Sequence, residues 1–271
     1  MGAYFITLNR NKKSVCIDLK TPKGLELFYD LVKKSDVVIN NFGAGVPTRL
    51  KIDHAHLKQV NPRIISCSIT GFGNDGPGFK RPAFDQVAQA MGGGMSITGA
   101  NEDQQVRAGI PIGDLGGGMF AVMGIQAALL EREKSGEGQD VDISMLDCQI
   151  SLLNYMATMH FISGKDPYPI GNSHFVHVPY NTFTTSDGQI VIAVITDNFW
   201  QNLKQVVQIE SLEKPEYDTQ PGRFKDQHFI NAALNDKLST KSAGHWLGLL
   251  EAARIPCAHV NKFSQALSDP Q

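Results

Sequence analysis

Asp114 is the residue whose surroundings could best support covalent chemistry. It lies in the run GIPIGDLGGG over residues 109–118, between an extended apolar stretch and a helix that opens with three glycines. The unpaired N–H groups and the positive dipole at a helix start would keep its carboxylate ionised, as a nucleophile requires. The glycines would admit a bulky substrate and could turn N–H groups toward a developing oxyanion. The simpler alternative, that Asp114 only caps the helix, stays open because aspartate is a preferred N-cap residue.

A glycine-rich motif precedes this region, but its context does not suit a dinucleotide site. Residues 71–76, GFGNDG, fit the pattern G-x-G-x-x-G and follow a predicted strand. A dinucleotide fingerprint requires a helix that begins within the glycines, so that its N-terminus holds the pyrophosphate. Pro77, Gly78 and Pro82 follow here, and no helix is expected before Pro82. The segment is therefore predicted to be a loop, with neither a nicotinamide nor a flavin cofactor.

Neither the histidines nor the cysteines are spaced as metal ligands. Two histidines do not fill a zinc shell, and the sequence places no cysteine or carboxylate partner at ligand spacing beside either pair. The pairs are His54-Ala55-His56 and His174-Phe175-Val176-His177. The cysteines are far apart and form no C-x-x-C pair, which predicts reduced thiols in a cytoplasmic protein. They are Cys16, Cys67, Cys148 and Cys257.

Composition places the chain among ordinary globular proteins. Of its 271 residues, 42% are apolar and 19% are charged, and the formal net charge is −2. This balance gives no reason to expect nucleic acid or an anionic membrane as a partner, so any anion site must be local. No apolar run approaches the roughly 20 residues of a membrane-spanning helix, and the N-terminus lacks the features of a signal peptide.

The first part of the sequence alternates helices with buried strands, which predicts a Rossmann-like parallel α/β sheet. Thr21 is a suitable N-cap and Pro22 a suitable first residue for the first helix. The predicted helices cover residues 22–34, 54–60, 84–91, 115–133 and 146–163. The predicted strands cover residues 37–39, 64–70 and 141–145.

The second part of the sequence differs from the first in its amino-acid composition. From Gly164 to Tyr180 the sequence is rich in Gly, Pro, Asn and His, which is typical of a linker. Segments 180–184 and 190–195 then flank Ser186-Asp187-Gly188, which predicts a hairpin. Helices are expected over residues 197–207, 226–236 and 241–253. The predicted organisation is a large α/β domain over residues 1–163, a linker over 164–180 and a small α+β domain over 181–271.

Several short motifs resemble the family III CoA-transferases (the CaiB/BaiF family). They are NRNKKS at residues 9–14, DLKTP at 18–22, NFG at 41–43, ITGFG at 69–73, AQAMGG at 88–93 and GEGQ at 136–139. Motifs that occur in the same order are far more specific than any single one. They favour the nucleophile interpretation of Asp114 over the N-cap interpretation.

The resemblance implies a CoA-transferase in which Asp114 attacks the carbonyl of an acyl-CoA donor. A mixed anhydride and CoA thiolate would form, and CoA would reach a small carboxylic acid through an aspartyl-CoA thioester and a second anhydride. Anhydrides hydrolyse in water, so the carboxylate needs a closable pocket that keeps water out. The resemblance also implies an interlocked homodimer, with coenzyme A as both substrate and product and no metal.

The family pattern carries residues that are expected to bind coenzyme A. Lys20 and Arg49 would pair with phosphate groups through charge-assisted bonds, although either would otherwise be an ordinary solvated side chain. The expected set is Ile17, Lys20, Asn41, Phe42, Gly43, Arg49, Leu50, Ala83, Phe84 and Asp85.

Two alternatives to CoA transfer stay open. The family includes α-methylacyl-CoA racemases, whose histidine precedes the aspartate that matches Asp85, but Phe84 stands there in this sequence and has no titratable proton. The family's usual first strand and helix and its usual last segment are expected outside residues 1–271, so an inactive CoA-binding fragment is the second alternative. The glycine-rich flap of formyl-CoA transferases is not evident in Gly171–Tyr180, and the sequence does not identify the two acids.

Overall fold

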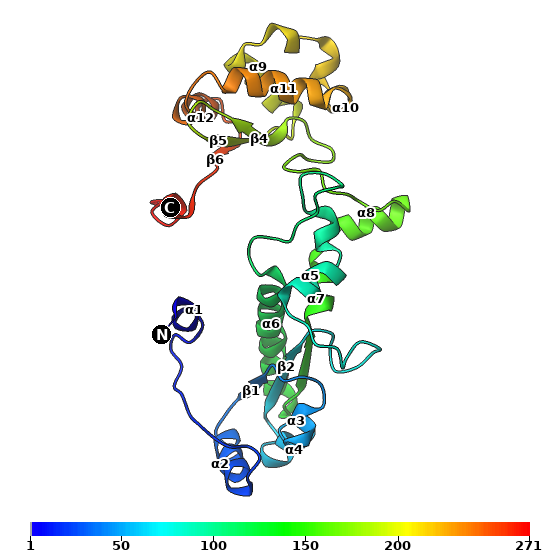
Figure 1. Ribbon diagram of the computed structural model, residues 1–271, viewed down its shortest axis with the longest axis vertical. Helices are drawn as coiled ribbons and strands as arrows, with labels where there is room; N and C mark the ends of the chain where they lie inside the picture. Colours follow the sequence, from blue (N-terminus) through cyan, green and yellow to red (C-terminus); the bar gives the residue numbers. More distant parts are fainter. Residues whose placement is uncertain (1) are drawn as a thin grey trace. The chain divides into compact units, whose positions relative to one another are not determined.

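The computed structural model describes residues 2–271, which divide into two compact units (Figure 1). Unit 1 contains the chain up to Ile97 together with Val106–Pro167, and unit 2 contains Thr98–Gln105 and Tyr168–Gln271. Each unit has a sheet of its own and an apolar core of its own.

The sheet of unit 1 is parallel, as the alternation of helices and apolar strands predicts. Its strands are β1 (Val37–Asn40), β2 (Ile65–Thr70) and β3 (Asp140–Ser144), in the order β1-β2-β3. Strand β2 lies between the other two and is almost entirely buried, which explains its continuous apolar and small-residue sequence. The carboxyl ends of all three strands therefore lie at one edge of the sheet, where ligands of open α/β sheets usually bind.

Helices cover both faces of this sheet. On one face, α6 packs against β2 and β3, close to Ile69, Val141 and Ile143. On the other face, α2 and α4 form a small core with Val38. The helices of unit 1 are α1 (Ala3–Leu8), α2 (Pro22–Val32), α3 (Val46–Arg49), α4 (His54–Val60), α5 (Asp85–Met91), α6 (Ile112–Ser135), α7 (Met145–Leu152) and α8 (Tyr155–Ser163), with the 3-10 helix η1 (Gly94–Ile97).

Helix α6 is the longest element, and its first turn contains Asp114. It packs against β2, β3, α5 and α7, and Gly136, in the left-handed conformation, ends it. By length and composition, it is the one described helix that could cross a membrane, a test that core helices of soluble proteins also pass.

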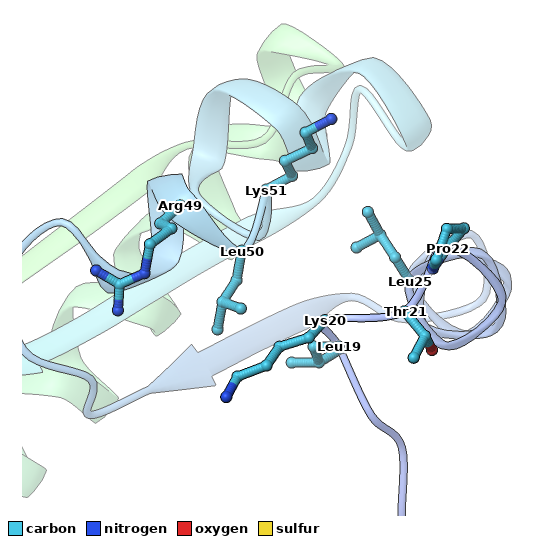
Figure 2. Close-up of a pocket in the computed structure, with 8 residues that line it drawn as sticks. All are labelled: Leu19, Lys20, Thr21, Pro22, Leu25, Arg49, Leu50 and Lys51. Atoms are coloured by element: carbon cyan, nitrogen blue, oxygen red, sulfur yellow. The ribbon is translucent and has the colours of Figure 1, made fainter.

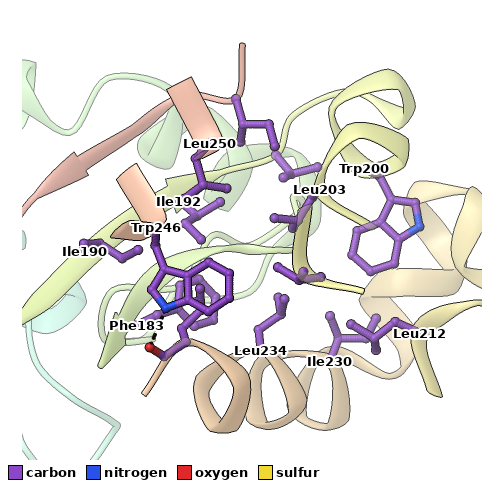
Figure 3. Packing of buried hydrophobic residues seen from close by; sticks show 14 of the residues in the cluster. Phe183, Ile190, Ile192, Trp200, Leu203, Leu212, Ile230, Leu234, Trp246 and Leu250 are labelled. Atoms are coloured by element: carbon purple, nitrogen blue, oxygen red, sulfur yellow. Dashed lines mark hydrogen bonds between the residues drawn. The ribbon is translucent and has the colours of Figure 1, made fainter. Parts of the chain in front are cut away.

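Unit 2 is an α+β structure with an antiparallel sheet. Strands β4 (Tyr180–Thr184) and β5 (Gln189–Ala193) form the predicted hairpin, and β6 (Cys257–His259) pairs with β5. Its core gathers around Trp200 and Trp246 (Figure 3), and the indole N–H of the latter donates to the Leu238 carbonyl at 2.8 Å. The helices are α9 (Asp197–Val207), α10 (Gln220–Lys225), α11 (Gln227–Leu238), α12 (Ala243–Ala252) and α13 (Phe263–Ala266), with the 3-10 helices η2 (Glu210–Leu212) and η3 (Pro215–Asp218).

Two sequence-based boundaries are wrong for local reasons. The predicted helix over 146–163 is broken into α7 and α8, because Asn154 adopts a positive φ of 50° between them. The predicted helix over 115–133 begins three residues earlier, at Ile112, directly after Pro111 as its N-cap residue. Asp114 is therefore inside the first turn of α6 and not in front of the helix.

Candidate active site

The N-terminus of α6 is capped by a side chain from another helix. Its own N-cap residue, Pro111, has no side-chain group to offer. The Oδ1 atom of Asp85, the first residue of α5, accepts hydrogen bonds from the backbone N–H of Gly113 at 2.8 Å and from that of Asp114 at 3.3 Å. Asp85 thus does for α6 what an N-cap aspartate normally does for its own helix.

The other N–H groups of this first turn are also paired. The N–H of Ile112 donates to the Ile110 carbonyl at 2.8 Å, and that of Leu115 donates to the Pro111 carbonyl at 2.9 Å. The expectation that Asp114 would lie beside unpaired N–H groups is therefore wrong. The capping interpretation of Asp114 is wrong too, because Asp85 holds the capping position.

The glycines around Asp114 serve close helix packing. A Cβ on Gly113 would lie 2.9 Å from the backbone oxygen of Asp85 and 2.9 Å from its Oδ1. Side chains on Gly116 and Gly117 would press into α7, with nearest atoms at 3.2 Å in each case. Gly118 is different, because no atom lies within 4 Å of a Cβ built there. Three of the four glycines are therefore required by the approach of α5 and α7.

The electrostatic setting makes Asp114 more basic than an ordinary aspartate. Partial burial raises the pKa of its carboxyl group, and the nearby charge of Asp85 raises it further. The shift is opposite in direction to the one expected from a helix dipole acting alone. The Asp114 side chain remains exposed, so a substrate can reach it. A more basic carboxylate is the better nucleophile while it stays ionised.

The carboxyl ends of β1 and β2 bring further predicted residues to the same edge of the sheet. The Asn41 side chain donates to the Ile69 carbonyl, and the Phe42 N–H donates to Asn40 Oδ1 at 3.2 Å. Ala83 lies against Gly71, where an added Cβ would come within 2.3 Å of the Ala83 Cβ. Gly43 is exposed.

A basic pocket of about 500 Å³ lies between the start of α2 and the end of α3 (Figure 2). It brings together the predicted residues Lys20, Arg49 and Leu50, and it adds Lys51. Figure 2 shows the Lys20 and Arg49 side chains extending to the same side, with Lys51 extending away from them. The full lining is Leu19, Lys20, Thr21, Pro22, Leu25, Arg49, Leu50 and Lys51. Ile17 is half-buried and lies outside this lining.

Local hydrogen bonds hold the two walls of this pocket. Asp18 Oδ1 accepts from the Lys20 N–H at 3.0 Å, and Thr21 Oγ1 caps α2 by accepting from the Gly24 N–H at 3.1 Å. The Tyr29 hydroxyl of α2 donates to the Lys51 carbonyl at 2.8 Å and so ties the walls together. Sequence reasoning missed Lys51, for which only its position two residues after Arg49 gave a signal.

The glycine-rich motif and the histidine pair at residues 54 and 56 have structural roles. Residues 71–76 form a loop, as predicted, and the next helix begins only at Asp85. His56 contacts the Asp53 carboxylate, which corrects the statement that its pair lacks a carboxylate partner. His54 Nδ1 lies 2.9 Å from the Ser66 hydroxyl. Among residues 2–271, no group of three or more histidine, cysteine or acidic side chains could hold a metal ion.

Comparisons with known proteins agree on one family. Over residues 1–271 the sequence matches the family model described as CoA-transferase family III. It is 34% identical over 271 residues to a succinate–glutarate CoA-transferase of Agrobacterium fabrum, covering 100% of this chain and 68% of the relative. It is 35% identical over 277 residues to a succinyl-CoA:mesaconate CoA-transferase of Haloarcula hispanica, covering 99% and 68%. A CaiB/BaiF family protein from Brucella suis has a similar crystal structure, with a TM-score of 0.90 and 34% identity over 99% of this chain and 71% of that one.

Proposed function

The chain belongs to CoA-transferase family III and is a transferase, and we propose that it moves coenzyme A from an acyl-CoA to a carboxylic acid through covalent intermediates on Asp114. The observation that carries this proposal is the exposed Asp114 carboxylate in the first turn of α6, held opposite Asp85 and made more basic by burial and by that charge.

The reaction divides into four balanced steps. An Asp114 oxygen bonds to the thioester carbonyl carbon, the C–S bond breaks, and CoA leaves as thiolate, which yields a mixed anhydride. The thiolate then attacks the aspartyl carbonyl and releases the donor carboxylate, which leaves an aspartyl-CoA thioester. The acceptor carboxylate attacks this thioester to form a second anhydride and free thiolate. Attack of the thiolate on the acceptor carbonyl gives the new acyl-CoA and restores Asp114.

The basic pocket of unit 1 supplies the charges that coenzyme A requires. Lys20 and Arg49 extend to the same side of the pocket, and Leu19, Leu25 and Leu50 give it apolar walls. A phosphate group held by a guanidinium and an ammonium makes charge-assisted bonds of the stronger kind. We therefore assign the phosphate groups of CoA to Lys20 and Arg49.

The names of the relatives support a substrate class. The two relatives described above are named for succinate, glutarate and mesaconate, which are all short dicarboxylic acids. We propose that the donor and acceptor of this protein are also short dicarboxylic acids, with succinyl-CoA as the first donor to test.

The test follows oxygen atoms. The protein is incubated with succinyl-CoA and ¹⁸O-labelled glutarate, and peptides are analysed by mass spectrometry. The mechanism places one acceptor oxygen in the Asp114 carboxylate, because the bridging oxygen of the second anhydride remains on the enzyme. Trapping with hydroxylamine should label the same residue. Asp114→Asn, which keeps the size and removes the nucleophile, is the matched control and should acquire neither mark.

Two other outcomes would contradict the proposed transfer of CoA. Folded protein that binds CoA but never gains ¹⁸O or a hydroxamate at Asp114 would contradict the proposed transfer chemistry. Solvent deuterium appearing at the α-carbon of a 2-methylacyl-CoA would instead indicate an isomerase, which the exposed, untitratable Phe84 beside Asp85 argues against.

We also propose that the protein acts as a homodimer. The exposed side of α6 carries Leu115, Met119, Val122 and Leu130, with exposed fractions between 47% and 72%. Apolar side chains gathered along one helix commonly mark an interface. Light scattering coupled to gel filtration should give twice the monomer mass, and a monomer at working concentrations would contradict this proposal.

A further inference from the structure

Gln89 joins α5 to the loop that leads into α6, beside the candidate active site. It lies one turn after Asp85 on α5, and only 2% of its surface is exposed. Its Nε2 donates to Asp85 Oδ2 at 2.7 Å, while its Oε1 accepts from the Ala108 N–H at 2.9 Å. Both ends of the buried amide are therefore paired, one with α5 and the other with the loop that leads into α6.

The Asp85 carboxylate is consequently held at both oxygens. Oδ2 is fixed by Gln89, and Oδ1 accepts from the N–H groups of Gly113 and Asp114. If the bond to Oδ2 were lost, the carboxylate would be free to rotate about its Cβ–Cγ bond, and Oδ1 would leave the first turn of α6. The position of the Asp114 backbone therefore depends on a side chain that does not touch Asp114 itself.

We propose that Gln89 is a positioning residue of this site, which locks Asp85 onto the start of α6 and thereby places the Asp114 carboxylate for attack. The inference rests on the proposed role of Asp114 as nucleophile and adds the residue that orients it.

The charged and titratable groups on the surrounding elements define what a change at Gln89 can alter. They are Asp85 on α5, Asp114 on α6, Arg107 in the preceding loop, and Asp147 and Cys148 on α7. The Arg107 guanidinium donates to the carbonyls of Ala108 and Gly109 at 2.9 and 3.4 Å. The anionic partner in direct contact with the Gln89 amide is Asp85.

Three variants separate positioning from packing. Gln89→Leu removes both hydrogen bonds. Gln89→Glu can reproduce them only when the new carboxyl group is protonated, because an ionised carboxylate cannot donate to Asp85. Ala88→Gly, at the neighbouring buried position of α5, weakens the same helix without touching the network and serves as the control.

The expected result is a split between binding and chemistry. Gln89→Leu should slow formation of the Asp114 adduct by about 10- to 100-fold, since misplacing a reacting group by about 1 Å has effects of that size, and it should leave the Kd for acyl-CoA unchanged. Gln89→Glu should be equally slow at neutral pH, and its rate relative to that of the wild-type protein at the same pH should rise as the pH falls. Ala88→Gly should keep the wild-type rate at temperatures where it is folded.

A readout independent of turnover distinguishes this inference from the proposed function. The ¹³C signal of the Asp114 carboxyl group, assigned with Asp114→Asn, should titrate at lower pH in Gln89→Leu because Asp85 no longer faces it, and at the wild-type pH in Ala88→Gly. If wild-type protein forms no adduct, the proposed function fails and this titration still tests the link. A Gln89→Leu protein with wild-type rate and wild-type titration would overturn the positioning role.

Discussion

Replacing Gly113 by alanine should loosen the contact between α5 and α6 and displace Asp114. An added Cβ would lie 2.9 Å from both the backbone oxygen and Oδ1 of Asp85, inside the 3.0 Å limit below which real Cβ contacts essentially do not occur. The nearest backbone atoms cannot rotate away, so the two helices must separate. The separation would also stretch the N–H bonds from α6 to Asp85 Oδ1, which measure 2.8 and 3.3 Å.

Two opposing effects set the change in the free energy of unfolding. Overpacking of this kind costs about 1–3 kcal/mol, while alanine gains about 1 kcal/mol over glycine inside a helix. The net change for Gly113→Ala is therefore a loss of about 0–2 kcal/mol. Gly118→Ala, five residues along the same helix, meets no atom within 4 Å and should gain about 1 kcal/mol. The free energies of unfolding of the two variants should differ by about 1–3 kcal/mol.

Hydrogen exchange of α6 peptides measures this difference directly. Both tryptophans, Trp200 and Trp246, belong to unit 2, so their emission during urea unfolding is an internal control that neither variant should change. Gly113→Ala should expose α6 amides faster than Gly118→Ala and should slow adduct formation at Asp114. Equal protection of α6 in the two variants, with equal rates, would refute the packing argument.

Arg49→Glu should weaken CoA binding by about 10- to 100-fold in calorimetric titration, because a charge-assisted bond contributes about 1.5–3 kcal/mol. Burial raises the pKa of the Cys67 thiol to about 11, so iodoacetamide at pH 8 should alkylate exposed Cys16 and spare Cys67 in peptide mapping. Folding raises the pKa of Asp114, so its contribution to stability is present at acidic pH and is lost as the pH rises through the folded pKa. Scanning calorimetry should therefore show that Asp114→Asn raises Tm at pH 7 and loses this advantage in acid.

Local patterns were sufficient to predict most of the elements of the sheet and of its helices. The alternation of amphipathic helices with short apolar strands gave β1, β2 and β3 to within one or two residues, because each pattern depends on neighbours in sequence. The break at Asn154 was missed for the opposite reason. An apolar run reads as one helix unless a residue such as asparagine adopts a positive φ, and that choice depends on packing.

The candidate site was predictable in its members but not in their contacts. Ordered motifs pointed to Asp114, Asp85, Lys20 and Arg49, and no pattern could show that Asp85 caps a helix 28 residues further along the chain. Gln89 lies in the motif at residues 88–93, but that motif does not indicate burial, because a single glutamine in an amphipathic helix is ordinarily a surface residue. Its burial arises only when α5 lies against α6 and α7.

The separation of the helix cap, Asp85, from the proposed nucleophile, Asp114, has a chemical reason. A carboxylate that accepts backbone N–H bonds at a helix start is stabilised in its ionised form, which lowers its basicity and its reactivity. Asp85 accepts those bonds, while Asp114, in the first turn of the same helix, has a raised pKa. Because the N–H groups at this helix start are already paired, the proposed mechanism requires that groups outside the first turn of α6 stabilise the charge of the tetrahedral intermediate. The arrangement therefore gives the backbone N–H bonds to Asp85 and not to Asp114, and it makes Asp85 and its support by Gln89 part of how Asp114 would react.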